Sequence, residues 1–236
     1  MRRLAAALRR EVTVQYRSHF YWVSLALVAF WIAVLSQFEV TGFAGAELLV
    51  AALAMVNLLS TTFMFVAGLV LLERVEGSFA ALAVTPLQPW QSLAVKVLTL
   101  SLLAAAETLA IVLVATRGGA DLAPLVAGLV LVGGTLTCFG VVAVARYDSL
   151  NRFFVPSLVW MAVLTLPIFA LFLPALKPAL IVHPLTPGLT LILSGLSETS
   201  GTALLTGGAG AVVWLAAAGV WGQSAFRRMG LRDAGN

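Results

Sequence analysis

Six long apolar stretches occupy most of this chain, and short polar segments separate them. Each stretch has about 18 residues or more, enough to cross about 30 Å of hydrocarbon as a helix. The chain is 61% hydrophobic and only 10% charged, which is more apolar than a soluble domain of 236 residues requires. These features predict an all-α polytopic membrane protein with six transmembrane helices, at residues 20–37, 48–72, 91–116, 122–145, 153–174 and 202–222.

The distribution of basic residues predicts the orientation of these spans. Twelve of the 14 lysines and arginines lie in the N-terminal segment, the second and fourth gaps and the C-terminal tail, whereas Arg117 and Lys177 lie in other gaps. Because cytoplasmic segments carry the excess of Lys and Arg, both termini are expected to be cytoplasmic, in the bacterial inner membrane. The net charge of +4 therefore reflects contact with the lipid bilayer, and no nucleic-acid partner is expected.

Residues 1–19 form a separate region before the first span. Residues 1–17 contain no Gly or Pro, and Leu4, Leu8, Val12 and Tyr16 recur every fourth residue, while five arginines lie on the other side. This pattern predicts a basic amphipathic helix in the membrane interface. The expected organisation is this helix, a transmembrane domain at 20–222 and a cytoplasmic tail at 223–236.

Polar residues inside two spans are candidates for a translocation path. The second span has a polar centre with Asn57, Ser60 and Thr61, and the third contains Glu107. Such groups are costly in hydrocarbon unless they find partners or face a hydrated cavity. Two interpretations stay open: hydrogen bonds between helices, or a polar substrate path.

The gap before the last span is the longest of the outer segments. His183-Pro184 is turn-like, and the following apolar run at 189–193 is too short to span a membrane. Residues 183–201 are therefore expected to form a re-entrant or interfacial segment, with His183 as a turn or packing residue. Pro167, in the fifth span, is expected to kink that helix.

The segment 73–90, between the second and third spans, is the cytoplasmic connection richest in information. Residues 78–84 favour a helix, and Phe79 and Leu82 fall on one face of it before Thr85-Pro86 ends it. A short apolar helix in the cytosol fits a groove on a partner protein, with the charges at its start guiding orientation. The alternative is a surface helix lying against lipid headgroups.

The run from Glu73-Arg74 through Gly77 to Ala81-Leu82-Ala83-Val84-Thr85-Pro86-Leu87, followed by Trp90 and Lys96, resembles permease subunits of type-2 ATP-binding-cassette (ABC) exporters. The arginine-rich helix before the first span and the six-span count are also similar to that family. The short loops and His183-Pro184-Leu185 resemble the fluoroquinolone-type drug exporters within it.

This resemblance implies a half-transporter that pairs with a second permease subunit, identical or sister, and with a cytosolic ABC ATPase subunit. ATP and Mg²⁺ would be bound by that ATPase, so no catalytic, cofactor or metal residue is expected in this chain. The family's polysaccharide and large lipid exporters carry extra domains that this chain lacks, which favours a small amphipathic or hydrophobic substrate. The implied coupling residues are Glu73, Arg74, Glu76, Phe79, Leu82, Thr85 and Pro86.

Two other classes of function remain as alternatives. The first is a non-transporting membrane scaffold or assembly factor. The second is a membrane-embedded enzyme, which would need convergent acids, histidines or metal ligands inside the bundle. Glu107 alone does not supply such a set.

Overall fold

The computed structural model describes residues 2–37, 44–77 and 88–233, and within these ranges the regular structure is entirely helical. This confirms the predicted all-α class. The elements are α1 (Arg2–Arg17), α2 (Phe20–Leu35), α3 (Ala46–Leu58), the π-helix η2 (Leu59–Met64), α4 (Phe65–Val75), α6 (Pro89–Ala115), α7 (Leu122–Val144), α8 (Leu150–Leu164), α9 (Leu166–Phe172), the 3₁₀-helix η3 (Pro174–Leu176), α10 (Lys177–Leu180), α11 (Thr186–Ser194) and α12 (Gly201–Asp233).

Five of the described helical segments are long and apolar enough to cross a membrane, or six if the bent pair α1–α2 is counted. This agrees with a polytopic membrane protein. Helix α2 has only 16 residues, and it meets α1 at a bend of 64°. His19 makes this bend in the left-handed conformation, with φ of 61°, so α1 leaves the line of the first span.

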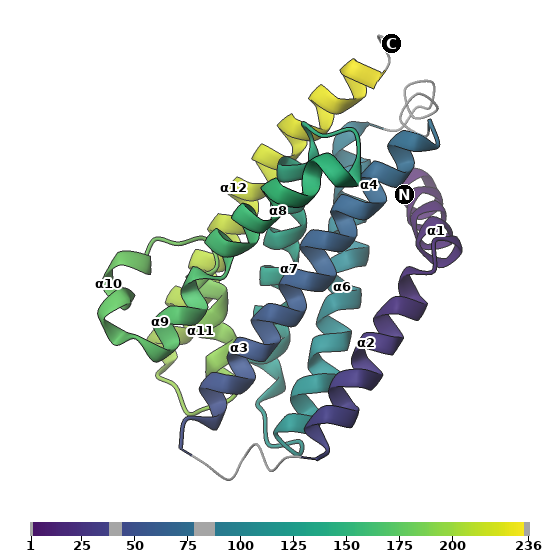
Figure 1. Ribbon diagram of the computed structural model, residues 1–236. Coiled ribbons are helices and arrows are strands. Elements are labelled where there is room, and N and C mark those ends of the chain that lie inside the picture. The colour runs from purple at the N-terminus through teal and green to yellow at the C-terminus, as the bar shows by residue number, and fades with distance from the viewer. Residues whose placement is uncertain (1, 38–43, 78–87, 234–236) are drawn as a thin grey trace.

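The helices form a bundle with both chain termini at one end, which is called the terminal end below (Figure 1). Helix α7 is the most buried of the candidate spans and packs against α6, α11 and α12. The α8–α9 segment and α12 leave most of their surface exposed. Helix α1 packs on α6 at the terminal end, beside the start of α2.

Two spans are interrupted where the sequence contains residues that disturb a helix. The fifth predicted span breaks at Thr165 into α8 and α9, with Pro167 in the first turn of α9, which confirms the expected kink. The second span contains the π-helix η2, which was not predicted. Thr62 in η2 donates a hydrogen bond to the carbonyl of Leu58 at 2.6 Å, and the wider turn shifts the side-chain register between α3 and α4.

Helix α11 is the short element expected within residues 183–201. Its nine residues span about 13 Å, too little to cross a bilayer. Gly188, Leu189 and Ile192 are buried, and α11 packs against both α7 and α12. A methyl group on Gly188 would lie 2.3 Å from Cγ2 of Val132, so the glycine allows the close approach of α11 to α7.

The end of the last predicted span differs from the structure. Helix α12 does not end near residue 222 but continues without a break to Asp233. Its final turns include Arg227 and Arg228, so most of the segment expected as a tail belongs to the helix. Ala225, Phe226 and Met229 are buried there, and this packing explains why the helix continues past the apolar run.

Candidate functional site

Helix α1 is present as predicted, but the face that packs on the bundle is not the apolar stripe. Leu4, Val12 and Tyr16 are exposed, at 36%, 43% and 61% of their surface. The buried residues are Ala7, Glu11 and Gln15, on the neighbouring face of the helix that meets α6. An exposed apolar stripe is what an interfacial helix offers to lipid, whereas the polar face is held by specific contacts with protein.

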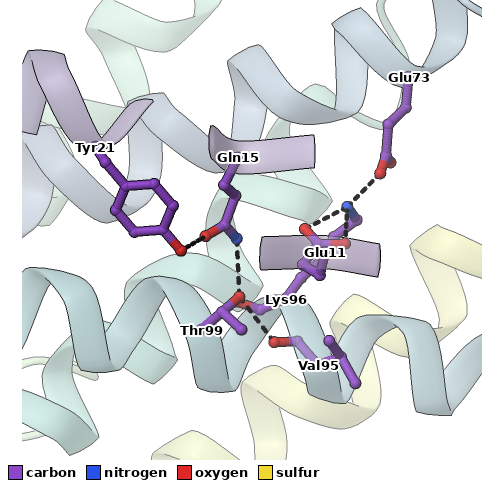
Figure 2. A network of polar contacts seen from close by, with 7 residues as sticks. All are labelled: Glu11, Gln15, Tyr21, Glu73, Val95, Lys96 and Thr99. Atoms are coloured by element: carbon purple, nitrogen blue, oxygen red, sulfur yellow. Dashed lines mark hydrogen bonds and ion pairs between the residues drawn. The ribbon is translucent and has the colours of Figure 1, made fainter. Parts of the chain in front are cut away.

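A buried ion network joins α1, α4 and α6 at the terminal end (Figure 2). Nζ of Lys96 donates to Oε1 of Glu11 at 2.8 Å, to Oε2 of Glu11 at 3.0 Å and to Oε1 of Glu73 at 2.6 Å. Lys96 is fully buried, and Glu11 and Glu73 are 7% and 2% exposed. A buried lysine retains its charge only beside compensating groups, and here two carboxylates surround one ammonium.

A second contact one turn along α1 fixes the register of the same two helices. Nε2 of Gln15 donates to Oγ1 of Thr99 at 2.9 Å, and the hydroxyl of Tyr21 donates to Oε1 of Gln15 at 3.0 Å. Glu11 and Gln15 are four residues apart on α1, and Lys96 and Thr99 are three apart on α6, so both pairs lie on facing surfaces. Figure 2 shows the two contacts side by side.

The C-terminal end of α4 is also tied to the turn between α7 and α8. The guanidinium of Arg74 donates to the carbonyl of Tyr147, and its Nη1 lies 3.2 Å from Oδ1 of Asp148. Glu73 thus holds the end of α4 on one side and Arg74 holds it on the other. Residues 76–77 emerge directly from this clamp, ahead of the segment 78–87.

The structure places three of the predicted coupling residues. Glu73 and Arg74 turn into the protein, whereas the side chain of Glu76 is exposed. The expectation that all three would present charges to a partner is therefore corrected for Glu73, since its carboxylate faces buried Lys96. The remaining four lie outside the described residues: Phe79, Leu82, Thr85 and Pro86.

The predicted polar centre is a set of hydrogen bonds between the second span and α6. Nδ2 of Asn57 donates to Oγ1 of Thr108 at 2.9 Å, and Oγ1 of Thr61 donates to Oε2 of Glu107 at 3.1 Å. Ser60 does not join them, because its hydroxyl donates to the carbonyl of Val56 in its own helix. The bonds between helices account for much of this cluster's polarity.

Two acceptor atoms in the polar centre have no hydrogen-bond partner among the described residues: Oδ1 of Asn57 and Oε1 of Glu107. Both are buried, and unsatisfied acceptors in an apolar interior are costly. The cluster therefore retains acceptor capacity toward a proton, water or a polar ligand. Whether it lines a path stays a hypothesis.

His183 occupies the turn position expected from the sequence. Its Nε2 lies 3.2 Å from the carbonyl of Val163, and its Nδ1 accepts from the backbone N–H of Leu185 at 3.3 Å. This pattern fits the neutral tautomer with the proton on Nε2, and burial lowers the pKa of the imidazole. In the part of the chain that the structure describes, no three His, Cys, Asp or Glu side chains gather as metal ligands.

The sequence profile of the fluoroquinolones export permease protein family matches residues 2–229. The chain belongs to this family. It is 34% identical over 172 residues to fluoroquinolones export permease proteins from two strains of Mycobacterium tuberculosis, covering 71% of this chain and 69% of each relative. This membership agrees with the resemblance to type-2 ABC permeases, and a transport permease is not expected to be an enzyme.

The Glu11–Lys96 contact in this permease was not predicted from the sequence. Lys96 was counted among the basic residues near the membrane surface, and Glu11 was given no role. One signal was available: Glu11 is the only acid in the first 38 residues, among five arginines. The partner residue, Lys96, lies seven residues after the start of α6. Its position becomes informative only when α1 is known to pack against α6.

Proposed function

We propose that this permease is the transmembrane subunit of an ATP-driven exporter in the bacterial inner membrane, with both termini cytoplasmic. A separate cytosolic ABC ATPase would bind ATP and Mg²⁺, and a second permease subunit would complete the transporter. The substrate would be a small amphipathic molecule of the kind named for its relatives, the fluoroquinolones.

The observation that carries this proposal is the clamp at the end of α4. The segment 78–87 follows a helix that Glu73 ties to α6 and that Arg74 ties to the α7–α8 turn, and Lys96 extends the first of these contacts to α1. The segment precedes α6, which begins at Pro89. Gln88 and Gln91 form reciprocal capping hydrogen bonds at the start of α6, and these bonds stabilise the first turn of that helix. A displacement of the segment would therefore move α1, α4 and α6 together, as a coupling element requires.

The test is the removal of the segment's aromatic side chain. Phe79→Ala should reduce co-purification with the ATPase, or reduce substrate-stimulated ATP hydrolysis, because a buried aromatic in a helix–groove contact often contributes roughly 2 kcal/mol or more. Leu82→Ala, on the same predicted face, should act in the same direction. Both variants should insert into the membrane at wild-type levels.

The matched control is Phe154→Ala in the first turn and a half of α8, where the phenylalanine is 60% exposed. It should leave ATPase association unchanged. If both segment variants associate and couple as well as wild type, the segment is not the coupling element and the ATPase partnership loses its support.

A further inference from the structure

A cleft opens at the terminal end between α7, α8 and α12, away from both the Lys96 network and the polar centre. Its volume is about 810 Å³, within the range of about 300–1,000 Å³ typical of small-molecule sites. The lining includes Arg146, Tyr147, Trp160, Trp221, Ser224 and Arg228. Of these residues the coupling argument uses only Tyr147, whose backbone carbonyl accepts from Arg74.

The charge of this cleft is positive. Arg146 and Arg228 both line it, and the described residues of its lining include no Asp or Glu. The nearest acid along the chain, Asp148, pairs with Arg74 instead. Two guanidinium groups without an acid on the same wall favour an anionic ligand, and a carboxylate suits the planar donor geometry of Arg.

The inner wall of the cleft is aromatic. The rings of Trp160 and Trp221 lie 6.2 Å apart between centroids, and Phe139 lies 6.1 Å from Trp221 in an edge-to-face arrangement. Trp221 is 51% exposed, although it belongs to this ring cluster. A tryptophan that is half exposed and shares a cleft with two cations suits a ligand that joins an aromatic system to a carboxylate.

The same two tryptophans also border a second cavity, between α8, α12 and the turn at His183. It has a volume of about 280 Å³, and its other walls include His183, Pro184 and Trp214. His183 is held in the neutral tautomer by its two backbone contacts. Trp160 and Trp221 are therefore shared by the cationic cleft and by a second cavity whose lining is mostly apolar.

We propose that the cleft is a recognition site for planar aromatic carboxylates, with the carboxylate between Arg146 and Arg228 and the ring system on Trp221. This inference rests on the proposed export function and adds its ligand chemistry and location. The second cavity, which shares both tryptophans, would offer the ring system a further apolar surface. An anionic lipid headgroup shares the charge requirement but not the need for an aromatic ring.

The test measures binding to the purified full-length permease in phosphatidylcholine nanodiscs, by equilibrium dialysis with nalidixate. This probe is a planar aromatic monocarboxylate without a basic amine, so the carboxylate is its only charge. Arg228→Gln and Arg146→Gln should each weaken binding about fivefold or more, since each removes one charge-assisted contact. Trp221→Leu should weaken binding as well, and the uncharged ethyl ester should bind poorly to wild type.

Arg227→Gln is the matched control, because Arg227 is an exposed arginine adjacent in sequence that does not line the cleft. It should bind nalidixate as wild type does, and thermal melting should show that all variants remain folded. Wild-type affinity in both cleft arginine variants, or equal affinity for the ester, would overturn the proposal.

Nanodiscs that contain phosphatidylglycerol distinguish an aromatic carboxylate site from a site for an anionic lipid headgroup. If phosphatidylglycerol abolishes nalidixate binding and co-purifies with wild type but not with Arg228→Gln, the cleft is a headgroup site and the proposal fails. ATP-dependent efflux of nalidixate from cells is measured in a separate experiment, because it tests the export function rather than the binding site. Unchanged efflux in the arginine variants would overturn the site and leave the export function standing, whereas arginine-dependent binding without efflux would support the site and count against export.

Discussion

At the scale of single residues, the main feature is a buried lysine that the sequence pattern had suggested would lie near the membrane surface. Lys96 lies fully buried in α6, and its ammonium contacts carboxylates from two other helices. Removing one member of a buried ion network leaves an uncompensated charge, which is far more costly than losing an exposed ion pair. The network is therefore better regarded as a junction of three helices than as an isolated salt bridge.

Lys96→Met should destabilise the protein by about 3–5 kcal/mol, because Glu11 and Glu73 would be left buried without a cation. The melting temperature of the purified protein in detergent measures this loss. Lys177→Met is the matched control, since Lys177 is the sequence's other lysine and is exposed on α10. If the Lys96→Met variant has the same melting temperature as the wild-type protein, the network contributes little to stability.

At the scale of elements, the packing of α11 depends on glycines as well as on its buried leucine and isoleucine side chains. A Cβ on Gly195 would lie 2.8 Å from the carbonyl oxygen of Asp121 and 2.6 Å from Cβ of Leu125. The N–H of Asp121 also donates to the carbonyl of Gly195 at 2.8 Å. The segments around Asp121 and Gly195 therefore cannot separate without losing a hydrogen bond. Small residues at such contacts let helices approach closely in an apolar solvent.

Gly195→Ala should therefore lower stability by about 1–3 kcal/mol through overpacking against backbone atoms. In contrast, Gly208→Ala on α12 meets nothing within 4 Å and should be neutral or slightly stabilising through helix propensity. Both variants are compared by thermal melting under the same conditions. Equal melting temperatures for the two would contradict the packing interpretation.

At the scale of the whole molecule, both termini and the Lys96 network share one end of the bundle (Figure 1). Helix α1 and the last turns of α12, which both carry basic residues, lie toward that end. Arg146 lines the same cleft as Arg228 of α12. Basic residues that are far apart in the sequence are therefore close to one end of the folded bundle. Gly77, after the end of α4, and Gln88, before the start of α6, are the described residues that flank the segment 78–87.

A membrane-impermeant thiol reagent applied to intact cells should label a cysteine placed at Ser197 and miss cysteines placed at Ala6 or Glu76. The physical reason is the positive-inside distribution of lysines and arginines. The native protein is its own control, because Cys138 is only 2% exposed and should not react. Labelling at Ala6 and Glu76 but not at Ser197 would reverse the orientation and remove the basis for a cytosolic coupling segment.

The chain's periodicity and hydropathy alone were sufficient for the helical class, the position of most spans and the kink at Pro167. These features are local, because a run of apolar residues or a missing backbone donor acts on the helix that contains it. The same holds for α1, whose length follows from the absence of Gly and Pro over residues 1–17. The polar centre was also recognisable, since buried polar groups must find partners wherever the helices meet.

Only the tertiary structure decided which face of α1 packs, where Lys96 points and how Arg146 and Arg228 come to share a cleft. Glu11, Glu73 and Lys96 are far apart in sequence, and no periodicity within one helix encodes their meeting. The π-turn at η2 and the continuation of α12 to Asp233 likewise depend on neighbouring helices. Such features arise because the cost of burying a charge or widening a turn is offset only by contacts from other elements, which exist once the bundle has assembled.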